Sequence, residues 1–169
     1  SWSPRTLSGL RLRLPVEAGK GYSITLPRPP VLPSVCAVLP EARIAVTPMD
    51  GSLRFAGTMQ FAGLDAAIEP RRVQAIVDAV PQYLPDFSSR DFAGLPAWAG
   101  LRPCTPDGMP LLGRSNRYAN FIVATGHAMM GVSLAPATGL LVGEMLAGRR
   151  PSIPLELFRP GRFDRRDRR

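Results

Sequence analysis

The sequence predicts an α+β fold: an antiparallel or mixed sheet covered by one helix, followed by a single strand–loop–helix unit. Two observations carry this prediction. Residues 11–61 contain short segments in which polar and apolar side chains alternate, which is the period of half-buried strands. Residues 120–148 run from an apolar strand through a loop flanked by glycines into an apolar helix, and these are the parts of an α/β unit.

The sheet region carries a clear hairpin signal. Asp50 and Gly51 stand between two apolar-rich segments, and an Asp-Gly pair favours a two-residue turn because both residues tolerate positive φ. Proline interrupts the pattern over 28–34, which predicts a loop. The segments expected to form strands are 11–16, 20–27, 35–39, 42–49 and 53–61.

One helix is expected over about 70–83. Pro70 suits the first turn of a helix, where its missing N–H group is not needed. Apolar residues then recur at helical spacing, at Val73, Ile76, Val77 and Val80. The spacing predicts that this helix lies with one face on the sheet.

The last third of the chain alternates between strands and turns before it ends in a helix. A strand that carries Trp98 and Arg102 is expected within 92–108, before the turn TPDG. An apolar strand follows over 120–126, and a helix is expected from about Ser133 to Gly148.

Composition and charge exclude several classes of protein. The chain has 169 residues, 45% hydrophobic and 20% charged, which is typical of a globular domain. Two cysteines without any Cys/His cluster argue against a disulfide scaffold and against a zinc site. No signal peptide is expected, because no charged segment precedes an apolar one at the start. A membrane span over 121–148 is disfavoured by Pro136 and by five glycines.

Much of the net charge of +8 lies at the C-terminus, where the last eleven residues hold six Arg and two Asp. A basic tail of this kind can bind nucleic acid or acidic lipid. A solvated, frayed terminus is the favoured explanation, because no aromatic or glycine-rich RNA-binding motif accompanies the tail. We therefore expect no nucleic-acid partner.

The loop GHAMMG, residues 126–131, precedes the apolar helix and holds the only histidine. Free backbone N–H groups and the positive end of the helix dipole point outward at such a helix start, where they can stabilise negative charge. Gly126 and Gly131 would let the backbone approach a ligand closely. A tight turn without a ligand has the same spacing. His127 has no identifiable partner in the sequence, which favours a structural role.

Arg102 is the other residue with chemical significance. A guanidinium in an otherwise apolar strand needs an anionic partner if it is buried, and a carboxylate matches its planar fork. That carboxylate could belong to a ligand, or it could be internal, with Asp107 as the candidate. Cys104 has no cationic neighbour and is treated as an ordinary thiol.

Taken in order, these motifs resemble the superfamily of FAD-dependent D-amino-acid oxidases and dehydrogenases, with bacterial D-amino-acid dehydrogenase small subunits and glycine oxidases nearest. The resemblance rests on PVEAGKGYSITLP (15–27), GLRPCTPDGMPLLG (100–113) and ATGHAMMGVSLAPATGLLVGEMLAG (124–148). Family members begin with a strand–GxGxxG–helix unit that binds the FAD pyrophosphate, and this chain has no such motif. It is therefore expected to correspond to the C-terminal portion of a family member.

The resemblance implies roles for particular residues. Arg102 resembles the arginine that pairs with the substrate carboxylate, and Tyr22 and Thr47 lie on strands of the family's substrate domain. The flavin ring is expected to lie against the backbone of one loop: Gly126, His127, Ala128, Met129, Met130, Gly131 and Val132. Glycine oxidases have an arginine where this chain has Met129, which favours a more apolar pocket and puts a glycine-sized substrate in doubt. No catalytic base and no metal ligand is implied.

The implied domains are a substrate-binding domain over 1–113, the last strand–loop–helix of a Rossmann-like FAD domain over 114–150, and a basic tail over 151–169. The implied reaction is oxidative deamination of a D-amino acid, with hydride transfer from the α-carbon to flavin N5. The isolated chain is expected to lack the pyrophosphate part of the FAD site, so activity is implied for a longer parent. A catalytically inert fold fragment and a basic binding module are the alternatives for the chain alone.

The expected partners follow from the uncovered apolar helix. Residues 120–148 should belong to a domain whose remaining strands are absent, and large uncovered apolar faces lead to association. Self-association or a missing FAD-domain partner is therefore expected. The resemblance also implies a cytoplasmic protein, with peripheral contact to the inner membrane through the basic tail as a further expectation.

Overall fold

The structure, a computed structural model, describes residues 1–164. Residues 165–169, which belong to the predicted basic tail, lie outside the described residues. The chain divides into two compact units. Unit 2 comprises Lys20–Leu101, and unit 1 comprises Ser1–Gly19 together with the chain from Arg102 onward. The domain boundaries predicted at 113 and 150 stay predictions.

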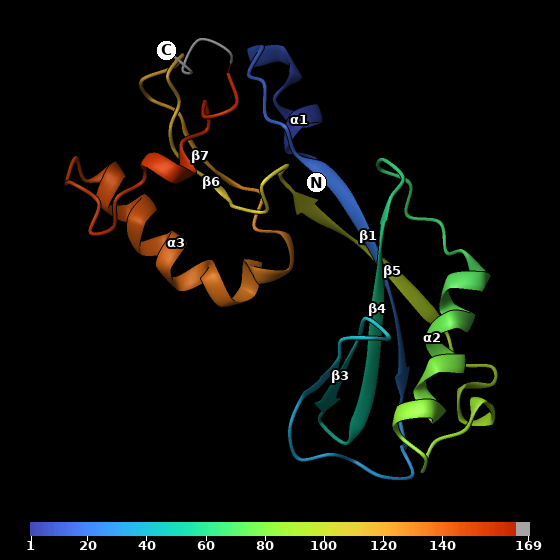
Figure 1. Cartoon of the computed structure of the whole chain (residues 1–169). Helices are drawn as coiled ribbons and strands as arrows, with labels where there is room; N and C mark the ends of the chain where they lie inside the picture. Colours follow the sequence, from blue (N-terminus) through green and yellow to red (C-terminus); the bar gives the residue numbers. More distant parts are fainter. Residues whose placement is uncertain (165–169) are drawn as a thin grey trace. The chain divides into compact units, whose positions relative to one another are not determined.

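Unit 2 is built on a five-stranded sheet in the order β2-β3-β4-β1-β5 (Figure 1). The strands are β1 Glu17–Leu26, β2 Ala37–Leu39, β3 Ile44–Met49, β4 Ser52–Phe61 and β5 Ala97–Cys104. The pairs β2/β3 and β3/β4 are antiparallel. This arrangement confirms the predicted antiparallel sheet and its strands over 20–27, 35–39, 42–49 and 53–61.

The β3–β4 hairpin forms where the Asp-Gly pair predicts it. Met49 pairs with Ser52, and the two residues between them are left-handed, with φ of 43° at Asp50 and 79° at Gly51. Positive φ at both central residues defines a type I′ turn, whose twist matches that of the flanking strands.

The helix α2, Pro70–Tyr83, has the predicted bounds and covers one face of the sheet. Its buried residues are those at helical spacing: Ile76, Val77 and Val80. They join strand residues such as Leu53 and Phe55 in the core of unit 2. The rings of Phe87 and Phe92 meet Phe55 edge to face, at centroid distances of 5.6 and 5.2 Å. Phe92 ends the short helix η2, Ser89–Phe92.

The predicted strand over 11–16 is wrong. This segment has no strand pairing, and it follows two short helical turns, α1 Ser3–Thr6 and η1 Ser8–Leu10. Arg11 ends η1 in a left-handed conformation with φ of 49°, and Pro15 has no N–H group to donate to a sheet. The polar and apolar residues of this segment alternate for another reason: Leu14 is buried in a small core with Leu111 and Val123.

Unit 1 contains the predicted strand–loop–helix. Strands β6, Leu111–Arg114, and β7, Ile122–Thr125, form an antiparallel pair in which Leu111 lies opposite Thr125. The chain then passes through η3, Ala128–Met130, into α3, Gly131–Leu146, and reaches η4, Glu156–Phe158. Leu141 and Met145 of α3 pack on Leu112 of β6. Together the two units confirm the α+β fold class.

Helix α3 leaves most of its apolar surface uncovered. Val132 is 91% exposed and Leu146 is 72% exposed. In the described chain, the stretch Ala128–Leu146 is the one helical segment long and apolar enough to cross a membrane, judged by length and composition alone, and 11% of it is buried. A core helix of a soluble protein meets the same criteria when its covering partner is missing, so this property does not by itself indicate a membrane protein.

Candidate functional site

The loop after β7 has a backbone that requires glycine at its first position. Gly126 has φ of +80°, and a Cβ atom placed on it would lie 2.6 Å from Cγ2 of Thr105. Both the left-handed conformation and the contact exclude a larger residue. Ala128 is also left-handed, with φ of 47°. Two left-handed residues within three positions turn the chain sharply from β7 into η3 and α3.

The backbone N–H groups at the helix start that follows have no side-chain cap. No side chain caps η3 or α3, and the Met130 N–H group is bonded to the carbonyl of His127. Uncapped N–H groups and the helix dipole favour negative charge at this end. Apolar side chains surround them, since Met129 is 70% exposed and Val132 is 91% exposed. The loop therefore combines backbone donors with an open apolar surface.

His127 is held by a partner in α3. One ring nitrogen, Nε2, lies 3.0 Å from Oγ1 of Thr138, within hydrogen-bond distance. Burial lowers the pKa of His127 below its usual value, which favours the neutral ring. Residue spacing does not indicate this partner, because the contact joins residues eleven positions apart across the bend between β7 and α3. The bond fixes the loop to the helix and supports the structural role expected for His127.

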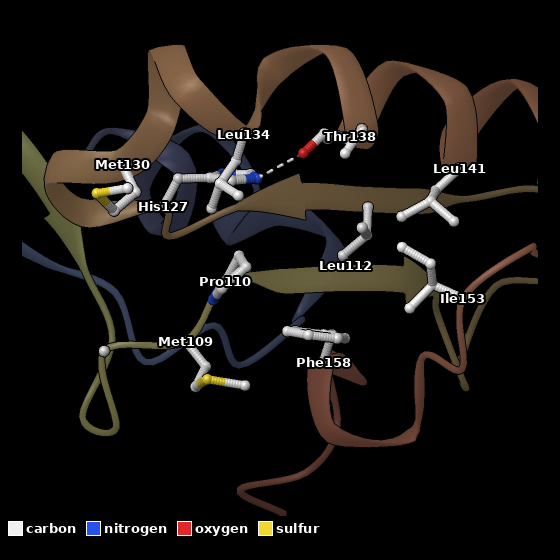
Figure 2. Close-up of a pocket in the computed structure, with 12 residues that line it drawn as sticks. Met109, Pro110, Leu112, His127, Met130, Leu134, Thr138, Leu141, Ile153 and Phe158 are labelled. Carbon is white, nitrogen blue, oxygen red and sulfur yellow. Dashed lines mark hydrogen bonds between the residues drawn. The ribbon is translucent and has the colours of Figure 1, made fainter.

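A mostly apolar cavity of about 320 Å³ lies between α3, β6 and the C-terminal segment of unit 1 (Figure 2). Leu134, Thr138 and Leu141 of α3 face Leu112 of β6 across it. Its remaining walls come from the turn before β6, from the loop after β7 and η3, from α3 and from the C-terminal segment, at Gly108, Met109, Pro110, His127, Met130, Ala137, Ile153 and Phe158. The hydrogen bond between His127 and Thr138 is at its edge, so the cavity offers few polar groups to a ligand.

Arg102 lies near the end of β5 and is half-buried. Asp107, which the sequence offers as its internal partner, forms a two-bond ion pair with Arg162. The pKa of Asp107 is lowered to about 2, and the hydrogen bonds from Arg162 are the largest cause of this shift. Both oxygens of the Asp107 carboxylate are thus engaged by a residue of the C-terminal segment.

The two sheet residues, Tyr22 and Thr47, differ in their surroundings. Tyr22 is 1% exposed in the core of unit 2, and its hydroxyl donates to Oε1 of Gln60 at 2.6 Å. Thr47 is half-buried and lies opposite Arg54 on β4. Its neighbour Val46 belongs to the same core as Tyr22, so Thr47 points to the opposite face of the sheet. Of the two, Thr47 is on the face that α2 does not cover.

Arg54 is a polar feature of this face that the sequence did not reveal. Its guanidinium carbon lies 5.5 Å from the ring centre of Trp98, and its Nε atom lies 3.4 Å from Oγ1 of Thr25. The contacts join three strands, which only the order of the sheet brings together.

Comparisons with known proteins agree on one family. The model of the family described as FAD dependent oxidoreductase matches residues 1–145. The D-amino acid dehydrogenase of Granulibacter bethesdensis is 35% identical over 155 residues, and that of Dechloromonas aromatica is 36% identical over 162 residues. These alignments cover 90% and 94% of this chain, and 36% and 38% of the two dehydrogenases. The chain thus spans well under half the length of these relatives.

Solved structures of two oxidases are similar to this chain as well. The glycine oxidase of Geobacillus kaustophilus superposes with a TM-score of 0.85 at 26% identity, over 95% of this chain and 43% of that one. The iminodiacetate oxidase of Chelativorans sp. BNC1 superposes with a TM-score of 0.80 at 27% identity, over 94% of this chain and 43% of that one.

Proposed function

The chain belongs to the family of FAD-dependent oxidoreductases, and from this premise we propose that it provides the substrate-binding part and the flavin-facing loop of an enzyme that oxidises D-amino acids. The observation that carries the proposal is the loop Gly126–Val132. Its left-handed glycine and its uncapped helix start leave backbone donors open beside an apolar surface.

The residues present fit one part of FAD, the isoalloxazine ring. A flat, mostly apolar ring with a polar pyrimidine edge needs apolar contact and N–H donors at one end. Met129 and Val132 supply exposed apolar surface, and the uncapped N–H groups of Ala128 and Met129 at the start of η3 would supply the donors. Bound FAD would accept a hydride at N5 from the α-carbon of the substrate. The helix dipole at this end would stabilise the negative charge that the ring gains. The described residues hold no GxGxxG motif for the pyrophosphate.

Arg102 is proposed to bind the substrate carboxylate. Arg102 is half-buried, and a planar guanidinium binds a carboxylate through two parallel hydrogen bonds. The two dehydrogenase relatives, at 35% and 36% identity, favour a D-amino acid over glycine, as Met129 does. Thr47, on the face of the sheet that α2 does not cover, stays a further candidate for substrate binding.

The partner proposed for this chain is a segment equivalent to the part of its relatives that lies outside the aligned region. The uncovered face of α3 supports this, because Val132, Leu140 and Leu146 are all more than half exposed. A chain that presents such a face alone is expected to self-associate.

The proposal is tested most directly by a chimera. In the Dechloromonas aromatica dehydrogenase, the segment that aligns with this chain is replaced by this chain. The chimera should bind FAD and oxidise D-amino acids with an artificial electron acceptor. Arg102→Ala should raise KM by about a hundredfold, as expected when one charge-assisted contact to a carboxylate is lost. Arg159→Ala is the matched control, because the exposed side chain of Arg159 is remote in sequence from the proposed site. A folded, FAD-loaded chimera without turnover would reject the proposal.

A further inference from the structure

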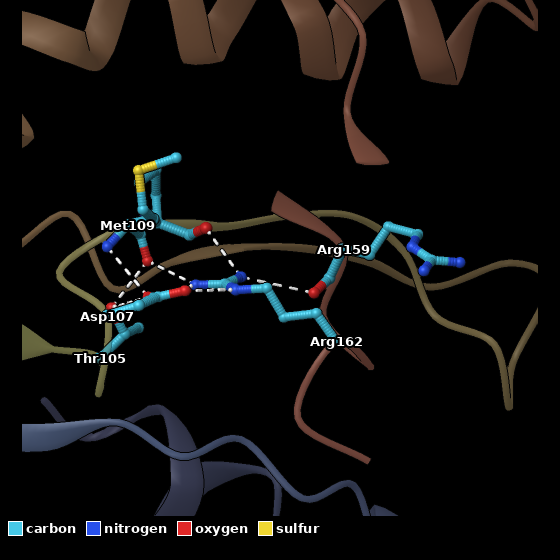
Figure 3. Close-up of polar contacts among 6 residues, drawn as sticks. Thr105, Asp107, Met109, Arg159 and Arg162 are labelled. Atoms are coloured by element: carbon cyan, nitrogen blue, oxygen red, sulfur yellow. Dashed lines mark hydrogen bonds and ion pairs between the residues drawn. The ribbon is translucent and has the colours of Figure 1, made fainter. Parts of the chain in front are cut away.

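The C-terminal segment of unit 1 is tied to the turn before β6 by one arginine (Figure 3). Nε of Arg162 donates to one oxygen of Asp107 at 2.9 Å, and Nη2 donates to the other at 2.8 Å. This is a two-bond pairing of guanidinium and carboxylate, the strongest geometry for such an ion pair. The Arg162 side chain is 11% exposed and the Asp107 side chain is 38% exposed, so solvent screens the pair in part.

Arg162 also bonds to the backbone of the same turn. Nη2 donates to the carbonyl of Met109 at 2.7 Å, and Nη1 donates to the carbonyl of Pro110 at 3.1 Å. All three guanidinium nitrogens therefore have partners in this one turn. A lysine at this position could not reproduce the pattern, because its single ammonium group lacks the planar fork.

The turn itself is fixed from inside. The Thr105 hydroxyl donates to the carbonyl of Met109 at 2.7 Å, and the Met109 N–H donates to Asp107 at 3.1 Å. Thr105 is 8% exposed. These bonds hold its methyl group, Cγ2, in one position.

That methyl group packs against the start of the flavin-facing loop. The position of a Cβ atom on Gly126 would be 2.6 Å from Cγ2 of Thr105 and 3.8 Å from Cα of Pro110. The strand register explains this closeness, because Leu111 lies opposite Thr125. The residue before β6 and the residue after β7 are therefore neighbours. A contact that holds Met109 and Pro110 acts directly beside Gly126.

We propose that Arg162 is a positioning residue for the loop Gly126–Val132, acting through Asp107 and the Thr105–Pro110 turn. The inference rests on the proposed function only for the identity of the ligand, the flavin ring, that the loop binds. Arg162 lies beyond the residues matched by the family model, which end at 145, and in the segment that the sequence suggests is a basic tail. On this view the Arg162 side chain supports the loop from outside the cofactor site and is not part of a solvated terminus.

The test compares three variants of the full chain. Arg162→Ala removes the contact, and Arg162→Lys keeps only the charge. Arg159→Ala is the matched control, since it changes the same residue type in the same segment, and Arg159 contributes its backbone carbonyl to the contact. Amide hydrogen exchange is measured residue by residue at a temperature where all variants are fully folded. FAD affinity is measured by flavin fluorescence on the same samples.

Arg162→Ala should raise exchange at Met130, whose N–H group is bonded to the His127 carbonyl within the loop, by about tenfold or more, because a charge-assisted contact worth that factor is lost. Arg162→Lys should resemble Arg162→Ala, and Arg159→Ala should stay within about twofold of the wild type. FAD affinity should fall by about tenfold in the first two variants. If Arg162→Ala does not fold, Asp107→Asn replaces it, and the Met130 amide should respond in the same direction.

Two outcomes separate this inference from the proposed function. Faster exchange confined to 159–164, with an unchanged loop, would overturn the positioning role, since Arg162 would then only fasten the segment. A loop that responds to Arg162→Ala in a protein without FAD affinity would uphold the positioning role and reject the flavin proposal.

Discussion

Replacing Gly126 with alanine tests how the loop after β7 is held. An alanine at φ of +80° adopts the left-handed region, which costs an L-residue about 1–2 kcal/mol. Its Cβ atom would also lie 2.6 Å from Cγ2 of Thr105, a distance at which one of the two must move. Thr105 cannot rotate freely, because its hydroxyl is bonded to Met109. Overpacking of this kind costs about 1–3 kcal/mol more, so Gly126→Ala should destabilise unit 1 by about 2–5 kcal/mol.

Gly108→Ala separates the two contributions. Gly108 has φ of +74° but no atom within 4 Å of its Cβ position, so only the conformational cost of about 1–2 kcal/mol applies. Thr105→Ser removes Cγ2 and keeps the hydroxyl. Combined with Gly126→Ala, it should restore about 1–2 kcal/mol relative to the sum of the single changes.

The assay is urea unfolding followed by NMR signals of unit 1, such as that of Val123, so that unit 2 does not contribute. Equal costs for Gly126→Ala and Gly108→Ala would refute the steric argument. An additive double variant would show that Thr105 and Gly126 are not in contact, and it would remove the route by which Arg162 acts on the loop.

Three further predictions concern charge and exposure. The folded state holds the pKa of Asp107 at about 2, below the usual 3.8, so the stability that the ionised carboxylate contributes is complete above about pH 4 and is lost as pH falls through 2. After discounting for the 38% exposure of the Asp107 side chain, this contribution is about 1–2 kcal/mol. Asp107→Asn should abolish that part of the acid unfolding curve followed by circular dichroism. Burial lowers the pKa of His127 below 6.5, so stability should fall as pH drops from 6.5 towards the folded-state pKa, and His127→Asn should flatten this slope in thermal unfolding measured across that pH range. The double variant Val132→Glu, Leu140→Glu should shift the chain towards monomer in sedimentation experiments, because it places charge on the exposed apolar face of α3. The control replaces the exposed Val35 and Val38, which are distant in sequence, with glutamate and should leave the profile unchanged. An unchanged profile of the α3 variant would contradict association through α3.

Sequence reasoning succeeded where a local pattern determines the structure. The Asp50-Gly51 turn and the helix that starts at Pro70 are short-range features, and both have the predicted bounds. The strand–loop–helix after residue 113 follows from apolar periodicity. The segment 11–16 misled because Leu14 is buried without a sheet, which produces the same alternation as a strand.

The contacts that build the candidate site could not be predicted in this way. Thr138 reaches His127 across a bend, and Arg162 reaches Asp107 across 55 residues. Nothing in the spacing of these residues signals either pair. The special role of Gly126 was easier to predict from the sequence, because a glycine between a strand and a helix start suggests close approach of the backbone. The atom that it approaches, Cγ2 of Thr105, follows only from the register of β6 and β7.

The most direct test of the flavin-facing loop is an NMR titration of the full chain with FAD, with riboflavin beside it. Both flavins share the ring, and only FAD carries the pyrophosphate. The account predicts that both shift the amide signals of Gly126–Val132, because the loop contacts the ring through its backbone. Shifts caused by FAD alone and confined to arginine-rich segments, with an unchanged loop, would contradict it and would indicate simple anion binding.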